Sequence, residues 1–250
     1  MIGLIIRNYQ TEKPYLSIPD LIRVRKAINK IPNTYLVTKK IKQIDEWIVS
    51  AAGIHFAANT NRGTIAQGDP IAIKTEFIVR SPLHVGELQL HVGTKDTLIK
   101  EVQTPYKRLV WNSNQIVNQA ITQPYWLVDT KETGHFVVKD PSKIGQAAPD
   151  PAMVVNAQFT IEGERIQVSR PVQELVVDPV KGEYAQPIAI TPRSIFQINH
   201  PNILLPKGSG ETKSFEVSIK AMGNISAGKV SAINQNGNVM GTLELPAGIQ

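Results

Sequence analysis

The sequence predicts a mainly β protein: an antiparallel β-sandwich of immunoglobulin or fibronectin type, preceded by an α-helical hairpin and followed by a second, smaller or truncated β-sandwich. Apolar residues recur at helical spacing only near the N-terminus, and alternation with period two takes over from about residue 64. Pro and Gly, 17 of each, punctuate the alternating runs. Short strands without intervening helices are typical of sandwiches. The expected division is 1–60, 61–192 and 193–250.

The helical hairpin is predicted from two amphipathic runs separated by Pro32-Asn33. The first, SIPDLIRVRKAINKI, has Ser17, Pro19 and Asp20 as start signals. The second, TYLVTKKIKQIDEWIVSAAGIHFAA, is expected to be one longer helix with Asp45 and Glu46 on the face opposite its apolar stripe. If this chain does not cover the stripe, it would form a docking face for a neighbouring domain. That candidate docking face consists of Ile41, Ile44 and Ile48.

The strands come in two sets, with a tight hairpin turn at Gly163-Glu164. Those of the large sandwich are GDPIAIKTEFIVRS, HVGELQLHVGT, TLIKEVQ, QIVNQAIT, GHFVVKD, AMVVNAQFTIEG, ERIQVSRPVQELVVD and EYAQPIAITP. Those of the smaller one are SIFQIN, NILLP, SFEVSIKAM, GKVSAIN and NVMGTLELPAG.

Composition excludes several classes of function. The net charge of +6 is scattered, aromatic residues make up 6% of the chain, and no nucleic-acid-reading motif occurs, so nucleic acid is not an expected partner. The absence of Cys excludes disulfides and thiolate metal sites. No apolar run approaches the roughly 20 residues that cross a bilayer, and MIGLIIRNYQ lacks the basic region and cleavage pattern of a signal peptide.

Asp178 and Glu183 are the most suggestive pair of carboxylates. Catalytic carboxylates work in a cleft that separates their pKa values. Here Asp178-Pro179 and Gly182-Glu183 carry turn residues between two alternating runs, which favours a hairpin turn over catalysis.

The histidines and the glycine motifs predict no catalytic residue, metal ligand or cofactor site. No two of His55, His84, His91, His135 and His200 stand at the spacing of a helical zinc site. No nucleophile elbow, phosphate-binding loop or dinucleotide fingerprint is present.

Aromatic residues form the best candidate binding surface, since flat rings can stack on sugars. The candidates for glycan contact are Tyr106, Trp111, Tyr125, Trp126 and Phe136. The alternative is that Trp126 fills the core between two sheets, as is common in sandwiches.

Residues 123–192 carry a series of signatures: PYWL, an Ile-Gly before a Pro-containing loop, RPV, VDPVKGE and PIAITP. In this order they resemble a stretch downstream of the catalytic domain in long bacterial PIG-L/LmbE-type zinc-dependent deacetylases. AAGIHFAAN followed by GDPIAIKTEFIVRSP, and KSFEVSIKA to GTLELPAGI, extend the resemblance over nearly the whole chain.

The resemblance implies a non-catalytic accessory region that supports a catalytic deacetylase domain, in cis or in trans, or targets it to a glycan or cell-envelope substrate. It also implies a periplasmic or extracellular location. The catalytic motif of that family, A-H-P-D-D, does not match: at His200-Pro201, Asn202 and Ile203 replace both acids. A carbohydrate-binding or adhesion module and a purely structural spacer are the alternatives.

Overall fold

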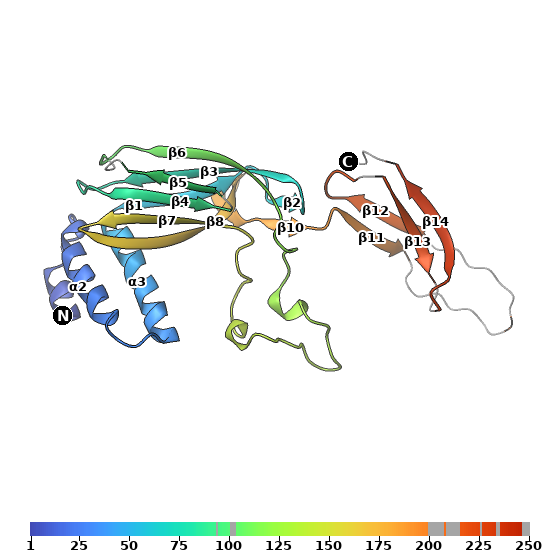
Figure 1. The fold of residues 1–250 in the computed structure, drawn as a ribbon, viewed down its shortest axis with the longest axis horizontal. Coiled ribbons are helices and arrows are strands. Elements are labelled where there is room, and N and C mark those ends of the chain that lie inside the picture. Colours follow the sequence, from blue (N-terminus) through green and yellow to red (C-terminus); the bar gives the residue numbers. More distant parts are fainter. Residues whose placement is uncertain are drawn as a thin grey trace. The chain divides into compact units, whose positions relative to one another are not determined.

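The computed structural model describes residues 1–93, 95–100, 104–199, 208, 216–225, 227–233 and 236–246. The protein is mainly β with an N-terminal helical region (Figure 1). It divides into two compact units, each assembled from segments that are separate in the sequence. Unit 1 comprises Met1–Gly63, Ile71–Gln115 and Asp150–Ile188, and unit 2 comprises Thr64–Pro70, Ile116–Pro149 and Ala189–Gln250. The motif at His200, Asn202 and Ile203 lies outside the described residues.

Unit 1 begins with α1 (Ile2–Asn8) and the 3-10 helix η1 (Pro14–Ser17), which the sequence did not predict. The two predicted helices follow as α2 (Ile18–Ile28) and α3 (Tyr35–Ala51). The start of α2 follows Ser17, as predicted, and the Thr34 side chain caps α3 by accepting a hydrogen bond from the Val37 amide. The two helices form a hairpin whose buried residues include Leu21 and Ile48. No helix among the described residues is long and apolar enough to cross a membrane.

The second helix is shorter than the sequence predicts, because GIHFAA is not helical. Gly53 adopts a φ of 63°, a left-handed conformation that ends helices. A Cβ at this position would meet the Arg80 carbonyl carbon at 3.3 Å. From Ile54 the burial alternates residue by residue, which is the pattern of a half-buried strand.

The strands of unit 1 form one eight-stranded sheet that curls into a half-barrel (Figure 1). They are β1 (Ile54–Thr60), β3 (Pro70–Val79), β4 (Gly86–Val92), β5 (Lys95–Ile99), β6 (Leu109–Ile116), β7 (Val154–Ile161), β8 (Glu164–Asp178) and β9 (Gly182–Pro187). Their order is β5-β4-β7-β8-β1-β3-β6, and β9 also pairs with β8. The predicted sheet was wholly antiparallel, but β1 and β8 run parallel over Ala58–Thr60 and Val172–Glu174.

The core of unit 1 includes three phenylalanine rings, which come from β1, β3 and β7. Phe77 on β3 is fully buried between Phe56 and Phe159, with ring centroids 6.3 Å and 5.7 Å away. These residues occupy alternate positions of their strands, so each strand has one buried and one more exposed face.

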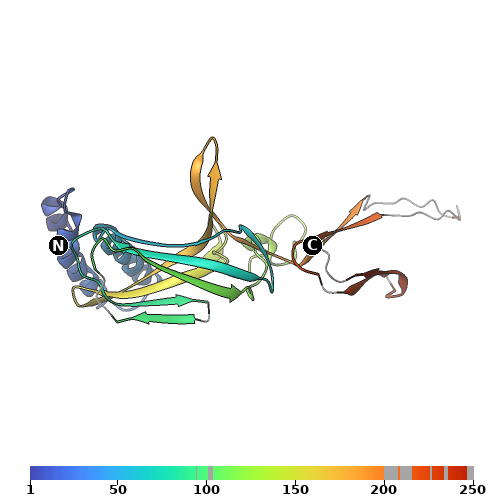
Figure 2. The ribbon, with the colours of Figure 1, turned by 90° about the horizontal axis from the view of Figure 1, so that it is seen from above.

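The hairpin of β8 and β9 extends away from the rest of the sheet (Figure 2). At its tip Asp178 Oδ1 accepts hydrogen bonds from the amides of Val180 and Lys181, both at 2.8 Å, and Gly182 has a φ of 76°. Asp178 pairs with Gly182 across the turn. The turn interpretation of the Asp178 and Glu183 stretch is therefore confirmed.

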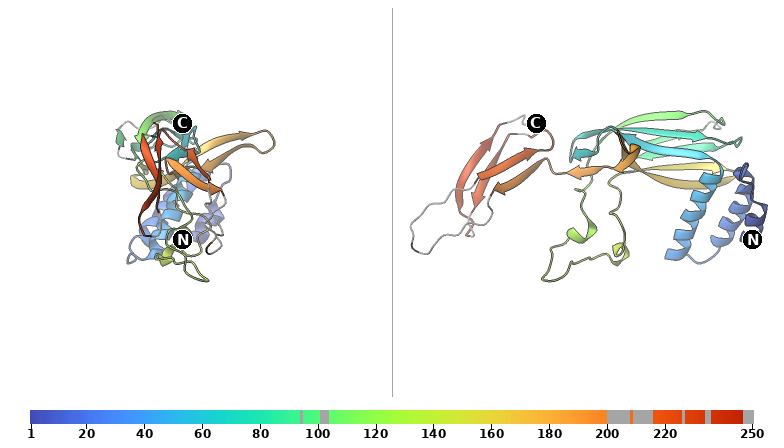
Figure 3. Two further views of the ribbon diagram at one scale, coloured as in Figure 1. Left: turned by 90° about the vertical axis from the view of Figure 1, so that its right-hand side faces the viewer. Right: turned by 180° about the vertical axis from the view of Figure 1, so that it is seen from behind.

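Unit 2 contains short strands and a long irregular segment (Figure 3). Its elements are β2 (Thr64–Ala66), the 3-10 helices η2 (Tyr125–Leu127) and η3 (Pro141–Lys143), β10 (Ala189–Thr191), β11 (Ser194–Asn199), β12 (Glu216–Ala221), β13 (Gly228–Ile233) and β14 (Val239–Leu245). β2 and β10 pair in parallel, whereas β11 with β12 and β13 with β14 form antiparallel pairs. The predicted strand NILLP, residues 202–206, lies entirely outside the described residues.

Two predicted strands do not form as expected: QIVNQAIT is a strand only at Gln115 and Ile116, which end β6, and GHFVVKD is not a strand. Residues 118–149, all of which are described, contain η2, η3 and turns, although QIVNQAIT and GHFVVKD alternate like strands. Pro124 and Pro141 open the two 3-10 helices or precede them, and Gly134 and Gly145 have φ near 87° and 86°. These residues favour turns over a continuous ladder.

Candidate functional site

Three of the five predicted glycan-contact aromatics lie together on the irregular segment of unit 2. Tyr125, Trp126 and Phe136 line a hollow of about 530 Å³ with Val138 and Ile144. The Tyr125 and Trp126 rings meet edge to face, 4.9 Å apart at 86°. Both are half-buried, and Phe136 is 47% exposed. We call this surface the aromatic hollow; it presents ring surface to solvent.

Local polar contacts position the residues of the aromatic hollow, because none of these residues belongs to a strand. The Gly145 amide donates to Tyr125 Oη at 3.2 Å. Asp140 caps η3 by accepting from the Ser142 hydroxyl and amide, and these bonds hold the pKa of its carboxyl below the ordinary value. Lys131 Nζ stands 5.4 Å from the centroid of the Phe136 ring. The hollow is thus shaped by turns and caps.

The other two aromatic candidates, Tyr106 and Trp111, belong to unit 1. Tyr106 is exposed, and its amide donates to the Val79 carbonyl at 2.8 Å. Trp111 is half-buried on β6. The structure therefore groups Tyr125, Trp126 and Phe136 around one hollow, which Tyr106 and Trp111 do not line.

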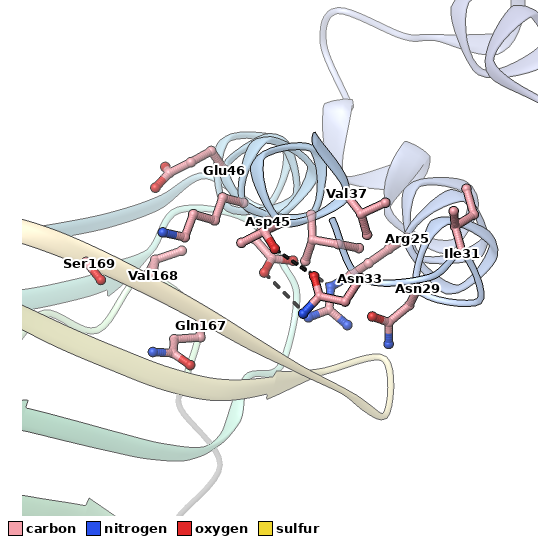
Figure 4. Close-up of a pocket in the computed structure, with 13 residues that line it drawn as sticks. Arg25, Asn29, Ile31, Asn33, Val37, Asp45, Glu46, Gln167, Val168 and Ser169 are labelled. Carbon is pink, nitrogen blue, oxygen red and sulfur yellow. Dashed lines mark hydrogen bonds and ion pairs between the residues drawn. The ribbon is translucent and has the colours of Figure 1, made fainter. Parts of the chain in front are cut away.

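A second candidate site lies in unit 1 between α2, α3 and β8. It is a cleft of about 650 Å³, which we call the helix–sheet cleft. Figure 4 shows Arg25, Asn33 and Asp45 on its helical side and Gln167 and Ser169 on its sheet side. Its volume is in the range of small-molecule pockets.

Ion pairs fix the walls of the helix–sheet cleft. Arg25 Nε donates to Asp45 Oδ1 at 2.6 Å, and Arg25 Nη1 stands 3.5 Å from Glu164 Oε2. Asp45 was predicted to face solvent, but its side chain is only 6% exposed, because α2 brings Arg25 against it. Burial raises the pKa of Asp45, and the hydrogen bond from Arg25 opposes this rise. On β8, Arg170 donates two hydrogen bonds to the carboxylate of Glu46 on α3, from Nη1 to Oε1 at 2.7 Å and from Nη2 to Oε2 at 2.8 Å.

The predicted docking stripe on α3 divides between core and cleft. Ile44 and Ile48 are 2% and 0% exposed, so they are not part of an exposed face. Ile41 is half-buried and lines the helix–sheet cleft. The alternating pattern of β8 was visible in the sequence, but the Arg25–Asp45 pair was not, because it joins residues of different helices.

No group of three or more His, Asp or Glu side chains suited to a metal ion occurs in the described parts of the chain. His91 contacts Asp96 at 2.6 Å and His135 contacts Glu132 at 3.3 Å, both on the surface.

The turn geometry at Asp178 predicts its titration. Amide hydrogen bonds from Lys181 and Val180 hold the pKa of the Asp178 carboxyl below its ordinary value of 3.8. A lowered folded-state pKa means that this group contributes stability above its unfolded pKa, which is lost as pH falls through the folded pKa. An NMR titration of the Asp178 side-chain carbon should therefore give a pKa below 3.8. A value at or above it would contradict the turn.

Comparisons with known proteins add little. No family model matches the chain, and no curated protein matches it. Among solved structures, it is similar to the alkylpurine DNA glycosylase AlkC of Pseudomonas fluorescens bound to DNA containing an abasic site analog, with 9% identity and a TM-score of 0.19. The alignment covers 63% of this chain and 45% of that one, so the chain spans less than half the length of that protein. At this TM-score the likeness carries no argument about fold or function.

Proposed function

We propose that this chain is a non-catalytic accessory region that holds or targets a PIG-L/LmbE-type sugar N-deacetylase domain at a glycan or cell-envelope substrate, outside the cytoplasm of a bacterium. One structural observation supports the glycan contact: Tyr125, Trp126 and Phe136 gather around one hollow. The proposed partner rests on the resemblance of the signatures PYWL and VDPVKGE to that family. In PYWL, Pro124 precedes η2, and the Tyr, Trp and Leu residues form it. The proposal includes the view that the curled sheet is a variant of the immunoglobulin-like sandwich.

A stand-alone carbohydrate-binding module is the second candidate, because the same hollow favours it. The two differ in whether a deacetylase domain is needed for the biological effect. Both predict that the purified chain binds polysaccharide through the aromatic hollow.

Trp126→Ala is expected to weaken polysaccharide binding at least roughly tenfold, about 1.4 kcal/mol, because it removes one of the rings that form the hollow. The measurement is a titration of the purified chain with soluble neutral and anionic polysaccharides, at low and moderate salt. Tyr106→Ala is the matched control, since Tyr106 is an exposed aromatic of unit 1. It should bind as the parent chain does.

Two results would contradict the proposal. Binding only to anionic polymers and only at low salt would mean that the net charge of +6, and not the aromatic hollow, accounts for the interaction. Stoichiometric zinc binding by the isolated chain, with deacetylation of N-acetyl sugars, would show that the chain is itself catalytic.

A further inference from the structure

Among the described residues, no strand pairs with the α3-facing edge of β8 along its first half. On one side β8 pairs with β7 from Glu164 to Pro171, and β9 takes over from Gln173. On the other side, within the described residues, it pairs with β1 only over Val172–Glu174. The stretch before Val172 therefore has a free edge, and the helix–sheet cleft lies along it.

The register of the β7–β8 hairpin shows which backbone groups point toward this edge. The turn has two residues, Glu162 and Gly163, both with positive φ, so Ile161 and Glu164 form the hydrogen-bonded closing pair. Hydrogen-bonded and non-hydrogen-bonded pairs alternate along an antiparallel ladder. The even-numbered residues of β8 thus bond to β7, and the Val172 amide continues this series by donating at 2.9 Å to the carbonyl of Met153, the residue before β7.

The odd-numbered residues consequently direct their N–H and C=O groups away from β7. Gln167 and Ser169, which line the helix–sheet cleft, are both odd-numbered. The Ser169 carbonyl accepts a bond from Arg170 Nη1 at 2.9 Å, and the same guanidinium binds Glu46 on α3, which agrees with this direction. Pro171 also occupies an outward position, where its missing N–H breaks no bond to β7.

The opposite wall of the cleft is one face of α3 and the end of the helical hairpin. Val37 and Ile41 supply aliphatic surface there, and Thr38 and Lys42 supply polar groups. Lys42 is exposed, and no described residue forms an ion pair with it. The edge of β8, the aliphatic side chains of α3 and the Lys42 ammonium group thus all line the helix–sheet cleft of about 650 Å³.

We propose that the helix–sheet cleft binds an extended polypeptide segment of another protein, which adds a strand to the edge of β8 at Gln167 and Ser169 and packs against α3. The outward N–H groups of Gln167 and Ser169 and the Gln167 carbonyl recognise the backbone of the segment, as in other β-augmentation sites, while the Ser169 carbonyl already accepts a hydrogen bond from Arg170. Its side chains alternate, because successive residues of a strand point to opposite faces. Aliphatic residues meet Val37 and Ile41, and a carboxylate meets Lys42.

This inference does not rest on the proposed glycan function, since the aromatic hollow lies in unit 2. A second copy of this chain is a poorer occupant than a flexible segment. The walls are tied together by Arg170 and Glu46, which leaves a cleft rather than an open, flat edge.

The test uses the peptide Ac-TVEVTVE-NH2, whose valines and glutamates fit the pattern, with the full chain labelled with nitrogen-15. We expect saturable shifts at the amides of Gln167 and Ser169 and slower hydrogen exchange there. A peptide methylated on alternate backbone nitrogens, and one with lysine in place of glutamate, should each bind roughly tenfold more weakly or not at all.

Two variants locate the site. Gln167→Pro removes an outward donor while leaving the β7 ladder bonds intact, and Thr38→Trp fills the cleft from α3. Both should abolish the peptide-induced shifts. Gln43→Trp is the matched control, because Gln43 is an exposed residue of α3 that does not line the cleft, and it should bind normally.

Several results would overturn the proposal. They are no saturable shift with the parent peptide, equal binding of the methylated peptide, or binding unchanged in both Gln167→Pro and Thr38→Trp. A concentration-dependent dimer of the chain that Gln167→Pro abolishes would also overturn it, since a second copy would then occupy the cleft. None of these outcomes bears on polysaccharide binding by Trp126→Ala, so the two proposals fail separately.

Discussion

Arg25→Met is expected to lower the free energy of unfolding by about 3–5 kcal/mol, because it leaves the buried Asp45 carboxylate without its cation. The Asp45 side chain is 6% exposed and Arg25 Nε is 2.6 Å from it. Urea denaturation measured by circular dichroism would give the difference.

The pH dependence of this loss has a definite sign. Burial already raises the pKa of Asp45 above its ordinary value of 3.8, and removing Arg25 raises it further. The folded state then holds a proton that the unfolded state has released, so the stability of the variant falls as pH rises through this range. The deficit relative to the parent chain should grow between about pH 4 and pH 7.

Two variants act as controls for the Arg25 prediction. Arg23→Met removes a guanidinium on the same helix that is 70% exposed and pairs with Asp20, so it should cost no more than about 1 kcal/mol. The double variant Arg25→Met with Asp45→Leu removes both buried charges and should recover most of the loss. A cost of Arg25→Met equal to that of Arg23→Met would contradict the buried pair.

Phe77→Ala is expected to destabilise the chain by about 3–5 kcal/mol, because it opens a cavity between Phe56 and Phe159. Phe77 is fully buried on β3. The same denaturation measurement applies, and Phe136→Ala is the matched control. Phe136 is 47% exposed, so its loss should change stability by no more than about 0.5 kcal/mol. A small effect at Phe77 would mean that the sheet does not close around this cluster.

The sequence predicted elements whose information is local. The start of α2 at Ser17, the extent of β8 and the Asp178 turn follow from caps, alternation and turn residues. The prediction was wrong where contacts between distant residues override the local sequence pattern. The residues of GIHFAA resemble the helical run before them, but pairing with β3 makes most of this segment a strand. The curl of the sheet and the parallel β1–β8 ladder depend on residues far apart in the chain.

The two candidate sites also differ in how far local sequence predicts them. The grouping of Tyr125 and Trp126 was predictable from adjacency, and Phe136 joins them through the fold of a segment that alternates like a strand but is not one. The helix–sheet cleft was not predictable, because it depends on where β1 stops pairing with β8. Asp45 is buried because α2 places Arg25 against it. The hydrophobic periodicity of α3 does not show where α2 packs, so it could not predict this burial.

The place of β1 in the sheet has a consequence for synthesis on the ribosome. On one side β1 pairs with β3, which follows closely in the sequence. On the other side it pairs with β8, which emerges only after β3 to β6, the irregular segment of residues 118–149 and β7. Pairings between distant segments form slowly, and unpaired strand edges are prone to aggregation while they wait. The nascent chain therefore exposes one edge of β1 through much of its translation. We expect shortened chains that end before Glu164 to aggregate or to be held by chaperones, whatever their final partner.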